Sequence, residues 1–221
     1  MEKALIIGSS GGIGAALVAE LGARGVTVTG LSRRHDGLDV TDENSVATAL
    51  GALAPGFDLI LVATGALVID GSEPEKSLRS VTAQAMADQF ALNCIGPSLV
   101  LKHSLRLLPR DRRAVFAALS ARVGSIGDNA LGGWYSYRTS KAALNQMIHT
   151  GAIELARSHR RALCVALHPG TVATAFTEKY AQGHDRVAPD KAAAHLLGVI
   201  DGLEPADTGG FFDWQGKRVA W

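Results

Sequence analysis

Apolar and polar residues follow two alternating patterns from one end of this chain to the other. Short runs rich in Val, Ile, Leu and Ala predict strands, at residues 4–7, 26–31, 58–63, 114–119, 162–167 and 210–213. Longer stretches with apolar residues three or four positions apart predict helices, at residues 15–24, 41–53, 83–108, 134–158 and 190–200, the second of them capped by Thr41. Strands that alternate with helices in this way form a parallel sheet with helices on both faces. The expected fold class is therefore α/β, with a doubly wound parallel sheet.

Composition narrows the class of protein without naming its activity. The chain has 221 residues, and its 22 Lys and Arg nearly balance 21 Asp and Glu, for a net charge of +1. We expect one domain over residues 1–221, because the alternation continues without a linker or repeat. The sequence has no dense block of Lys and Arg that would indicate binding to nucleic acid or to a membrane surface. It also has no apolar run of the roughly 18 residues that a membrane span needs. Cys94 and Cys164 lie in apolar segments without metal-type spacing, which favours buried, reduced thiols in a cytoplasmic protein.

A glycine-rich turn follows the first predicted strand and precedes the first predicted helix. Its residues are Gly8, Ser9, Ser10, Gly11, Gly12, Ile13 and Gly14. Small residues let the backbone approach a pyrophosphate, whose charge the N-terminus of the helix then stabilises. A tight turn without a ligand is the alternative, but the strand–turn–helix context favours a dinucleotide. We therefore predict a Rossmann-type site in which the cofactor is bound by Gly8, Ser10, Gly12, Ile13 and Gly14.

One tyrosine and one lysine have the spacing of a proton-transfer pair. Tyr137 and Lys141 are four residues apart, so on a helix both project from one face and the ammonium lies near the phenol. The ammonium is expected to lower the proton affinity of the phenol, which suits an acid that protonates an alkoxide after hydride transfer. Tyr135 lacks such a partner, because Thr139 stands four residues after it. A solvated Tyr and Lys on a helix surface is the alternative for the pair taken alone.

Asn93 is singled out by the proline that follows it. Pro97 has no N–H with which to bond the carbonyl four residues back, and that carbonyl belongs to Asn93. The freed carbonyl can hold a water molecule, although a plain kink with the carbonyl bonded elsewhere is the other interpretation.

Further segments occur in the order found in one enzyme family. They are Asp39 with Val40, then Ala63, Thr64 and Gly65, then Asn93, Tyr137 and Lys141, and finally Pro169, Gly170, Thr171, Val172, Ala173 and Thr174. Together with the spacing of the glycines, they resemble the short-chain dehydrogenases/reductases. The stretch from Gly124 to Lys141 is most similar to the C-factor and sniffer-type carbonyl reductase branch.

This resemblance implies an oxidoreductase with a nicotinamide cofactor. Hydride would pass between the cofactor and a small ketone or aldehyde, with Tyr137 as general acid/base, Lys141 serving the phenol and the ribose, and Asn93 holding a water of a proton relay. The remaining cofactor contacts that it implies are Asp39 and Val40 at the adenine, Ala63, Thr64 and Gly65 at the strand end, and Pro169, Gly170, Val172 and Thr174 at the carboxamide. Position 63 departs from the family, because Ala63 stands where Asn is usual.

The catalytic serine of the family has no clear counterpart. It usually precedes the tyrosine by about 13 residues, which falls on Gly124. Ser125 is preferred and Ser120 comes next, while an alignment on the strand end puts Ala121 at the position. An oxyanion contact made only by water is a further alternative.

The second predicted strand ends in residues that bear on the choice of cofactor. Ser32 is followed by Arg33 and Arg34, which suit a 2′-phosphate, whereas an NAD enzyme would place a carboxylate here. NADP(H) is therefore favoured over NAD(H), the alternative being that both arginines are solvated turn residues.

The remaining expectations concern partners and the alternative function. The apolar surface of the two long helices predicts a homo-oligomer, a dimer or a tetramer. The seven histidines contain no pair at helical i, i+4 spacing, so no metal site is predicted. Residues 175–190 are expected to form a short mobile lid. A C-factor-like nucleotide-binding protein that signals or regulates, with weak or no turnover, is the alternative function.

Overall fold

The computed structural model describes residues 1–174, 176–180 and 186–221, and these residues contain six strands in one parallel sheet. The strands are β1 (Lys3–Ile7), β2 (Thr27–Leu31), β3 (Leu59–Val62), β4 (Ala114–Leu119), β5 (Ala162–His168) and β6 (Phe211–Asp213). Their order across the sheet is β2-β1-β3-β4-β5-β6, and every neighbouring pair is parallel. The doubly wound α/β architecture predicted from the sequence is confirmed.

Helices connect successive strands. They are α1 (Gly12–Ala23), α2 (Arg33–Asp36), α3 (Glu43–Gly51), α4 (Ala83–Phe90), α5 (Gly96–Ser104), α6 (Tyr135–Ser158) and α7 (Pro189–Gly202). One turn of π-helix, η2 (Ala91–Ile95), joins α4 to α5. Short 3-10 turns are η1 (Leu78–Ser80), η3 (Leu105–Leu107), η4 (Arg122–Gly124) and η5 (Pro205–Asp207).

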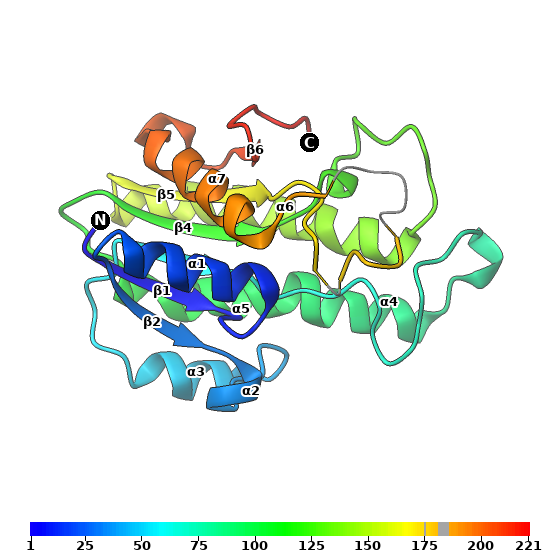
Figure 1. Ribbon diagram of the computed structural model, residues 1–221, viewed down its shortest axis with the longest axis horizontal. Coiled ribbons are helices and arrows are strands. Elements are labelled where there is room, and N and C mark those ends of the chain that lie inside the picture. Colours follow the sequence, from blue (N-terminus) through cyan, green and yellow to red (C-terminus); the bar gives the residue numbers. More distant parts are fainter. Residues whose placement is uncertain (175, 181–185) are drawn as a thin grey trace.

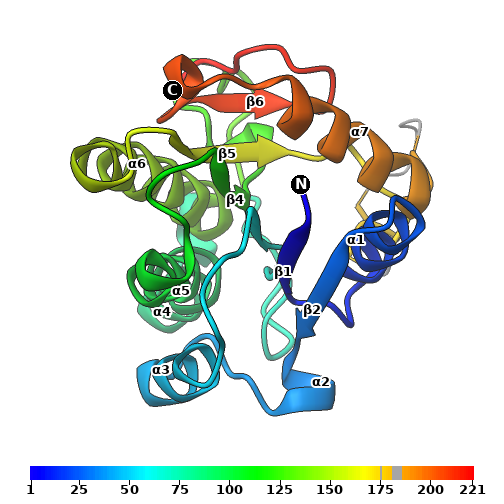
Figure 2. The same cartoon turned by 90° about the vertical axis from the view of Figure 1, so that its left-hand side faces the viewer.

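The helices form two layers with the sheet between them (Figure 1). Helices α1 and α7 cover one face, and α3, α5 and α6 cover the other (Figure 2). Alternate residues of a strand enter opposite cores: Ile6 of β1 packs with Leu17 of α1, while Leu5 packs with Val46 of α3. Because both faces of the sheet are buried, the strands are almost continuously apolar.

Three local features differ from the sequence prediction. The helix expected over residues 83–108 is divided by the π turn η2. The cap of α3 is Asp42, whose carboxylate accepts from the Asn44 N–H at 3.0 Å, so the prediction of Thr41 as the cap was wrong. The hydroxyl of Thr41 donates instead to Asp39. Helix α2 was not predicted, and it forms because the Ser32 side chain caps it.

Three further expectations concern the cysteines, the lid and a membrane span. Cys94 and Cys164 are free and buried, as predicted. Of the lid expected over residues 175–190, positions 175 and 181–185 lie outside the described residues. In the part of the chain that is described, no helix has both the length and the apolar character to span a bilayer.

The topology brings several of the predicted site residues to one edge of the sheet. All strands are parallel, so their carboxyl ends share an edge, where Gly8 follows β1, Ala63 follows β3 and Ser120 follows β4. At β1 the chain order reverses, since the connection through α1 leads to β2 on one side and β3 lies on the other. Such a switch point is where doubly wound sheets bind their ligands.

Candidate active site

The glycine loop brings the chain back against its own strand. The Gly8 N–H donates to the carbonyl of Leu31 at 2.7 Å, which ties the loop to the end of β2. A Cβ at Gly14 would lie 2.1 Å from the Gly8 carbonyl oxygen, so only glycine fits there. Helix α1 then begins at Gly12 with Gly11 as its cap, without a side-chain capping bond and without an acid in its first turn. Its first N–H groups therefore present partial positive charge to an anion.

Around this loop lie the other residues predicted to hold the cofactor. Thr64, directly after Ala63 at the end of β3, has a buried hydroxyl without a hydrogen-bond partner among the described residues. Val172 is 2% exposed, and the backbone of Gly12 faces the methyl group of Thr174. The buried Thr64 hydroxyl could bond a polar group of a ligand, and the N-terminus of α1 could bind its negative charge. Further along, Pro169 and Gly170 follow β5, where Gly170 has a φ of 79° beside the indole of Trp214.

A carboxylate of α2, which the sequence reasoning missed, contacts the residue after β2. The N–H of Ser32 donates to the Asp36 carboxylate at 2.8 Å, and its hydroxyl donates to the same oxygen at 3.2 Å. Arg33 and Arg34 are exposed, and no ion pair within the described residues includes them. Two exposed cations thus adjoin Ser32 together with one acid from the following helical turn.

Asp39 and Val40 lie in the loop before α3. The Asp39 carboxylate accepts from both the N–H and the hydroxyl of Thr41, at 2.9 and 2.7 Å, and these bonds lower the pKa of that carboxyl. Val40 is 4% exposed and packs against Gly96. The loop is therefore fixed by its own contacts and by the start of α5.

Tyr137 and Lys141 lie together in the first two turns of α6, as the spacing predicts. The Lys141 Nζ is 6.0 Å from the centre of the Tyr137 ring, and it donates to the carbonyl of Leu119 at 2.9 Å. Burial lowers the pKa of Lys141 from 10.5 to about 8. Burial also raises the pKa of the Tyr137 hydroxyl above its ordinary value of 10.0, so it outweighs the lowering expected from the ammonium. The phenol is therefore protonated at neutral pH.

Asn93 is wholly buried within the π turn and joins this pair through Gly65. Its Nδ2 donates to the carbonyl of Ala66 at 2.8 Å and to Gln89 Oε1 at 2.6 Å, and its Oδ1 accepts from the Ala66 N–H at 3.2 Å. A Cβ at Gly65 would lie 2.8 Å from Asn93 Oδ1 and 3.5 Å from Lys141 Nζ. The missing side chain of Gly65 is thus what lets the amide and the ammonium converge at the end of β3.

Known proteins are similar to this chain in sequence and in fold. A family profile described as "Enoyl-(Acyl carrier protein) reductase" matches residues 8–210. Over 206 residues the chain is 32% identical to 1-hydroxy-2-glutathionyl-2-methyl-3-butene dehydrogenase of Rhodococcus sp., covering 92% of this chain and 84% of that protein. The chain belongs to the short-chain dehydrogenase/reductase family. The resemblance read from the sequence is confirmed.

Other relatives of this short-chain dehydrogenase/reductase agree with that membership. C-signal of Myxococcus xanthus is 37% identical over 147 residues, 66% of this chain and 84% of C-signal. NADPH-bound carbonyl reductase from chicken fatty liver has a TM-score of 0.84 at 24% identity, covering 100% of this chain and 99% of that one. The carbonyl reductase Sniffer of D. melanogaster has a TM-score of 0.79 at 22% identity, covering 100% of both chains. The solved structures share the fold.

Neither candidate serine of this short-chain dehydrogenase/reductase has a bond to Tyr137. The Ser120 hydroxyl, 4% exposed, donates to Asn145 Oδ1 at 2.6 Å. The Ser125 hydroxyl, 2% exposed, accepts from the Asp128 N–H at 3.1 Å. Ala121, directly after Ser120, caps η4 and has no hydroxyl to offer. The assignment of either serine to catalysis stays a prediction.

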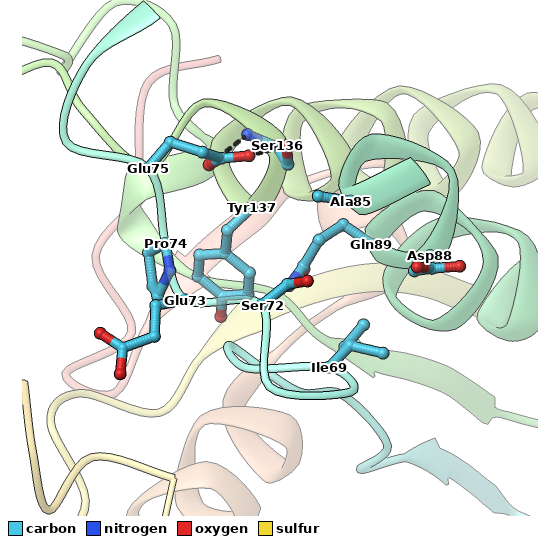
Figure 3. A pocket seen from close by; sticks show the side chains of 10 residues that line it. All are labelled: Ile69, Ser72, Glu73, Pro74, Glu75, Ala85, Asp88, Gln89, Ser136 and Tyr137. Atoms are coloured by element: carbon cyan, nitrogen blue, oxygen red, sulfur yellow. Dashed lines mark hydrogen bonds between the residues drawn. The ribbon is translucent and has the colours of Figure 1, made fainter. Parts of the chain in front are cut away.

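A small cavity opens beside the Tyr137 ring (Figure 3). It is lined by α4, by the start of α6 and by the segment that follows β3: Ile69, Ser72, Glu73, Pro74, Glu75, Ala85, Asp88, Gln89, Ser136 and Tyr137. The sequence reasoning missed Gln89 and Glu75. Gln89 holds Asn93, and Glu75 holds the residue before Tyr137. Among the described residues, no three His, Cys, Asp or Glu side chains gather as a metal site requires.

Proposed function

We propose that this protein is an NADP(H)-dependent carbonyl reductase that interconverts a small ketone or aldehyde and its alcohol. The approach of Lys141 and Asn93 at Gly65, with the Tyr137 ring centre 6.0 Å from the Lys141 Nζ, carries this proposal. A protein that only bound a nucleotide would need the glycine loop and could use Lys141 at the ribose, but it would need neither Tyr137 nor Asn93. The NADPH-bound carbonyl reductase of chicken fatty liver, which has the same fold, supports the cofactor class.

The cofactor would lie along the carboxyl edge of the sheet. Gly8, Gly12 and Gly14 and the first N–H groups of α1 would hold the pyrophosphate. Asp39 and Val40 would meet the adenine, and Val172 and Thr174 the carboxamide. When bound, the nicotinamide supplies or accepts the hydride.

Tyr137 would do the acid–base work on the substrate oxygen. In the reducing direction its hydroxyl gives a proton to the oxygen as the carbonyl carbon gains hydride, and the resulting phenolate is stabilised by the Lys141 ammonium. Burial keeps the pKa of the phenol high, so the acid is fully protonated at neutral pH. Asn93 and Lys141 then form the start of a path for the replacement proton.

Arg33 and Arg34 are the proposed readers of the 2′-phosphate. Both are exposed and adjoin Ser32 at the end of β2, which suits guanidinium–phosphate pairing. The carboxylate of Asp36, which accepts from Ser32, and that of Asp39, which interacts with Arg33, would oppose such binding.

Replacement of a single oxygen tests the activity. Tyr137→Phe keeps the ring and its packing, so we expect turnover of NADPH with a panel of carbonyl compounds to be lost while NADPH affinity, measured by fluorescence titration, is kept. Unchanged kcat in this variant would refute Tyr137 as the acid.

Two observations favour a second candidate function, a nucleotide-binding protein that signals or regulates, and the same assay tests it. C-signal is 37% identical over 66% of the chain, and both candidate serine hydroxyls are bonded elsewhere. NADPH binding without turnover of any carbonyl in the panel would favour a nucleotide-binding signalling or regulatory protein.

We also propose a homo-oligomer. Three large apolar side chains of η2 and α6 are exposed by 41–54%: Ile95, Met147 and Ile153. Exposed large apolar side chains on the elements that carry Asn93 and Tyr137 support a surface that another subunit covers.

A further inference from the structure

The helix that carries Tyr137 begins without a cap of its own. The residue before it, Trp134, has φ 52° and ψ 44°, which is the left-handed conformation that a Cβ disfavours. Its side chain makes no capping bond, although the first N–H groups of a helix need acceptors. Something outside α6 must therefore hold its first turn.

Glu75 is that group, and it comes from the segment after β3. Its carboxylate accepts from the N–H of Ser136 at 3.1 Å and also from the Ser136 hydroxyl. Its backbone carbonyl accepts from the N–H of Trp134 at 2.5 Å. Three donors at the start of α6 thus converge on one residue that precedes them by about 60 positions in the chain.

The Glu75 side chain is buried at this site. Glu75 is 6% exposed and Ser136 is 1% exposed. None of the ion pairs formed within residues 1–174, 176–180 and 186–221 includes Glu75. A serine in an ordinary cap conformation ahead of α6 could accept from one of these N–H groups without burying a carboxylate. Stability of the helix alone therefore does not account for Glu75.

What Glu75 controls is the surroundings of the Tyr137 ring. Ser136 directly precedes Tyr137, and Trp134, held by the Glu75 carbonyl, packs edge-on against the Tyr137 ring with centroids 6.3 Å apart. Glu75, Ser136 and Tyr137 line the same cavity (Figure 3). A shift of the first turn would move the phenol and one wall of its cavity together.

We propose that Glu75 is a positioning residue, which sets the first turn of α6 from outside the helix and so aims the Tyr137 hydroxyl at the substrate oxygen. This inference rests on the proposed role of Tyr137 as the acid. A displacement of about 1 Å at a reacting group can lower a rate about 100-fold, so the effect belongs in kcat and not in cofactor affinity.

Three variants of Glu75 test the proposal. Glu75→Gln keeps the length and an acceptor for the Ser136 N–H, and its NH₂ can donate to a hydroxyl that rotates, so kcat should stay within about threefold of the wild type. Glu75→Asp is one methylene short and should give an intermediate kcat. Glu75→Ala should lower kcat about 10- to 100-fold while the Kd of NADPH, from fluorescence titration, changes by less than about twofold. If Glu75→Ala does not fold, the difference between the Gln and Asp variants carries the test.

Asp42→Ala is the matched control. Asp42 is the carboxylate cap of α3, where it accepts from the Asn44 N–H at 3.0 Å, so its loss removes one helix cap without touching α6. We expect it to lower the Tm while kcat at saturating NADPH is unchanged. An equal fall of kcat in Asp42→Ala and Glu75→Ala would reduce Glu75 to a structural cap and overturn the proposal.

Hydrogen exchange of the free protein supplies a readout that needs no turnover. Amides 135–139 should exchange faster in Glu75→Ala and at the wild-type rate in Glu75→Gln. Unchanged protection, or wild-type kcat in Glu75→Ala beside an inactive Tyr137→Phe, would overturn this inference alone. An active Tyr137→Phe would instead remove the proposed function, and the exchange rates would still decide whether Glu75 holds the turn.

Discussion

Burial of the charged Lys141 side chain lowers the stability of the folded protein. The size of this effect can be predicted and then measured by replacing the lysine. The side chain is 3% exposed, and its ammonium has the Leu119 carbonyl as a hydrogen-bond acceptor. In Lys141→Met the apolar stem remains and the charge is gone. We expect this variant to lose activity and to change in stability in a way that depends on pH.

The size of the pH effect follows from the pKa of Lys141, which burial lowers from 10.5 to about 8. At about 1.4 kcal/mol per pKa unit, the folded state holds the ammonium at a penalty of about 3 kcal/mol. The penalty is complete below pH 8, where the lysine is charged in both states. It fades between pH 8 and 10.5, because the folded protein then holds a neutral amine while the unfolded chain still binds the proton.

Urea unfolding at pH 7 and pH 9.5 measures the effect. Lost packing and hydrogen bonds change the free energy of unfolding equally at the two pH values. The informative quantity is therefore how the difference in unfolding free energy between variant and wild type changes with pH. The stability of Lys141→Met relative to the wild type should fall by about 2 kcal/mol from pH 7 to pH 9.5. Lys191→Met, at an exposed position of α7, should show no such change. A pH-independent difference for Lys141→Met would refute the buried ammonium.

Three further outcomes test the cofactor, the serines and the assembly. Arg33→Asp should weaken NADPH and improve NADH, because a carboxylate repels the 2′-phosphate and accepts from a 2′-hydroxyl; the ratio of the two KM values measures it. If Ser125 orients the substrate, Ser125→Ala should lower kcat by an amount that corresponds to about 2.7–4 kcal/mol of activation free energy. A loss of kcat mainly in Ser120→Ala would instead assign that role to Ser120, and a normal kcat in the double variant would exclude both serines. Light scattering should give the mass of a dimer or a tetramer, and a monomer at working concentration would contradict the oligomer.

The sequence predicted the parts of the molecule that are set by local pattern. Apolar runs located the strands because both faces of the sheet are buried, and the glycine spacing located the loop because a Cβ at Gly14 would collide with the Gly8 carbonyl. The four-residue spacing of Tyr137 and Lys141 was sufficient to put them on one face of α6.

Contacts between distant segments escaped the same reasoning. Glu75 reaches the start of α6 from a loop with no periodicity, and the one available signal was that Gly132, Gly133 and Trp134 offer no capping side chain ahead of that helix. Asp36 reaches back to Ser32 through a four-residue helix too short to show a pattern.

Neighbouring residues with equal propensities were also hard to separate. Thr41 and Asp42 are both good helix caps, and the choice was made by Asp39, which takes the hydroxyl of Thr41 and leaves Asp42 to cap α3. The raised pKa of Tyr137 depends on how deeply the helix is buried, which spacing alone does not measure.

The π turn at Ala91–Ile95 restricts changes in the length of this helix, because it fixes a site residue and a core residue at the same time. A π turn contains one residue more than a regular helical turn, and one residue in an α-helix corresponds to a rotation of about 100°. Deleting that residue would therefore swing either Asn93 out of the site or Val100 out of the core, both of which are now fully buried. A change in the length of this helix disturbs the site or the core wherever it occurs, whereas a substitution at an exposed position disturbs neither. We therefore expect natural variation in chain length to fall in the loops on either side of it.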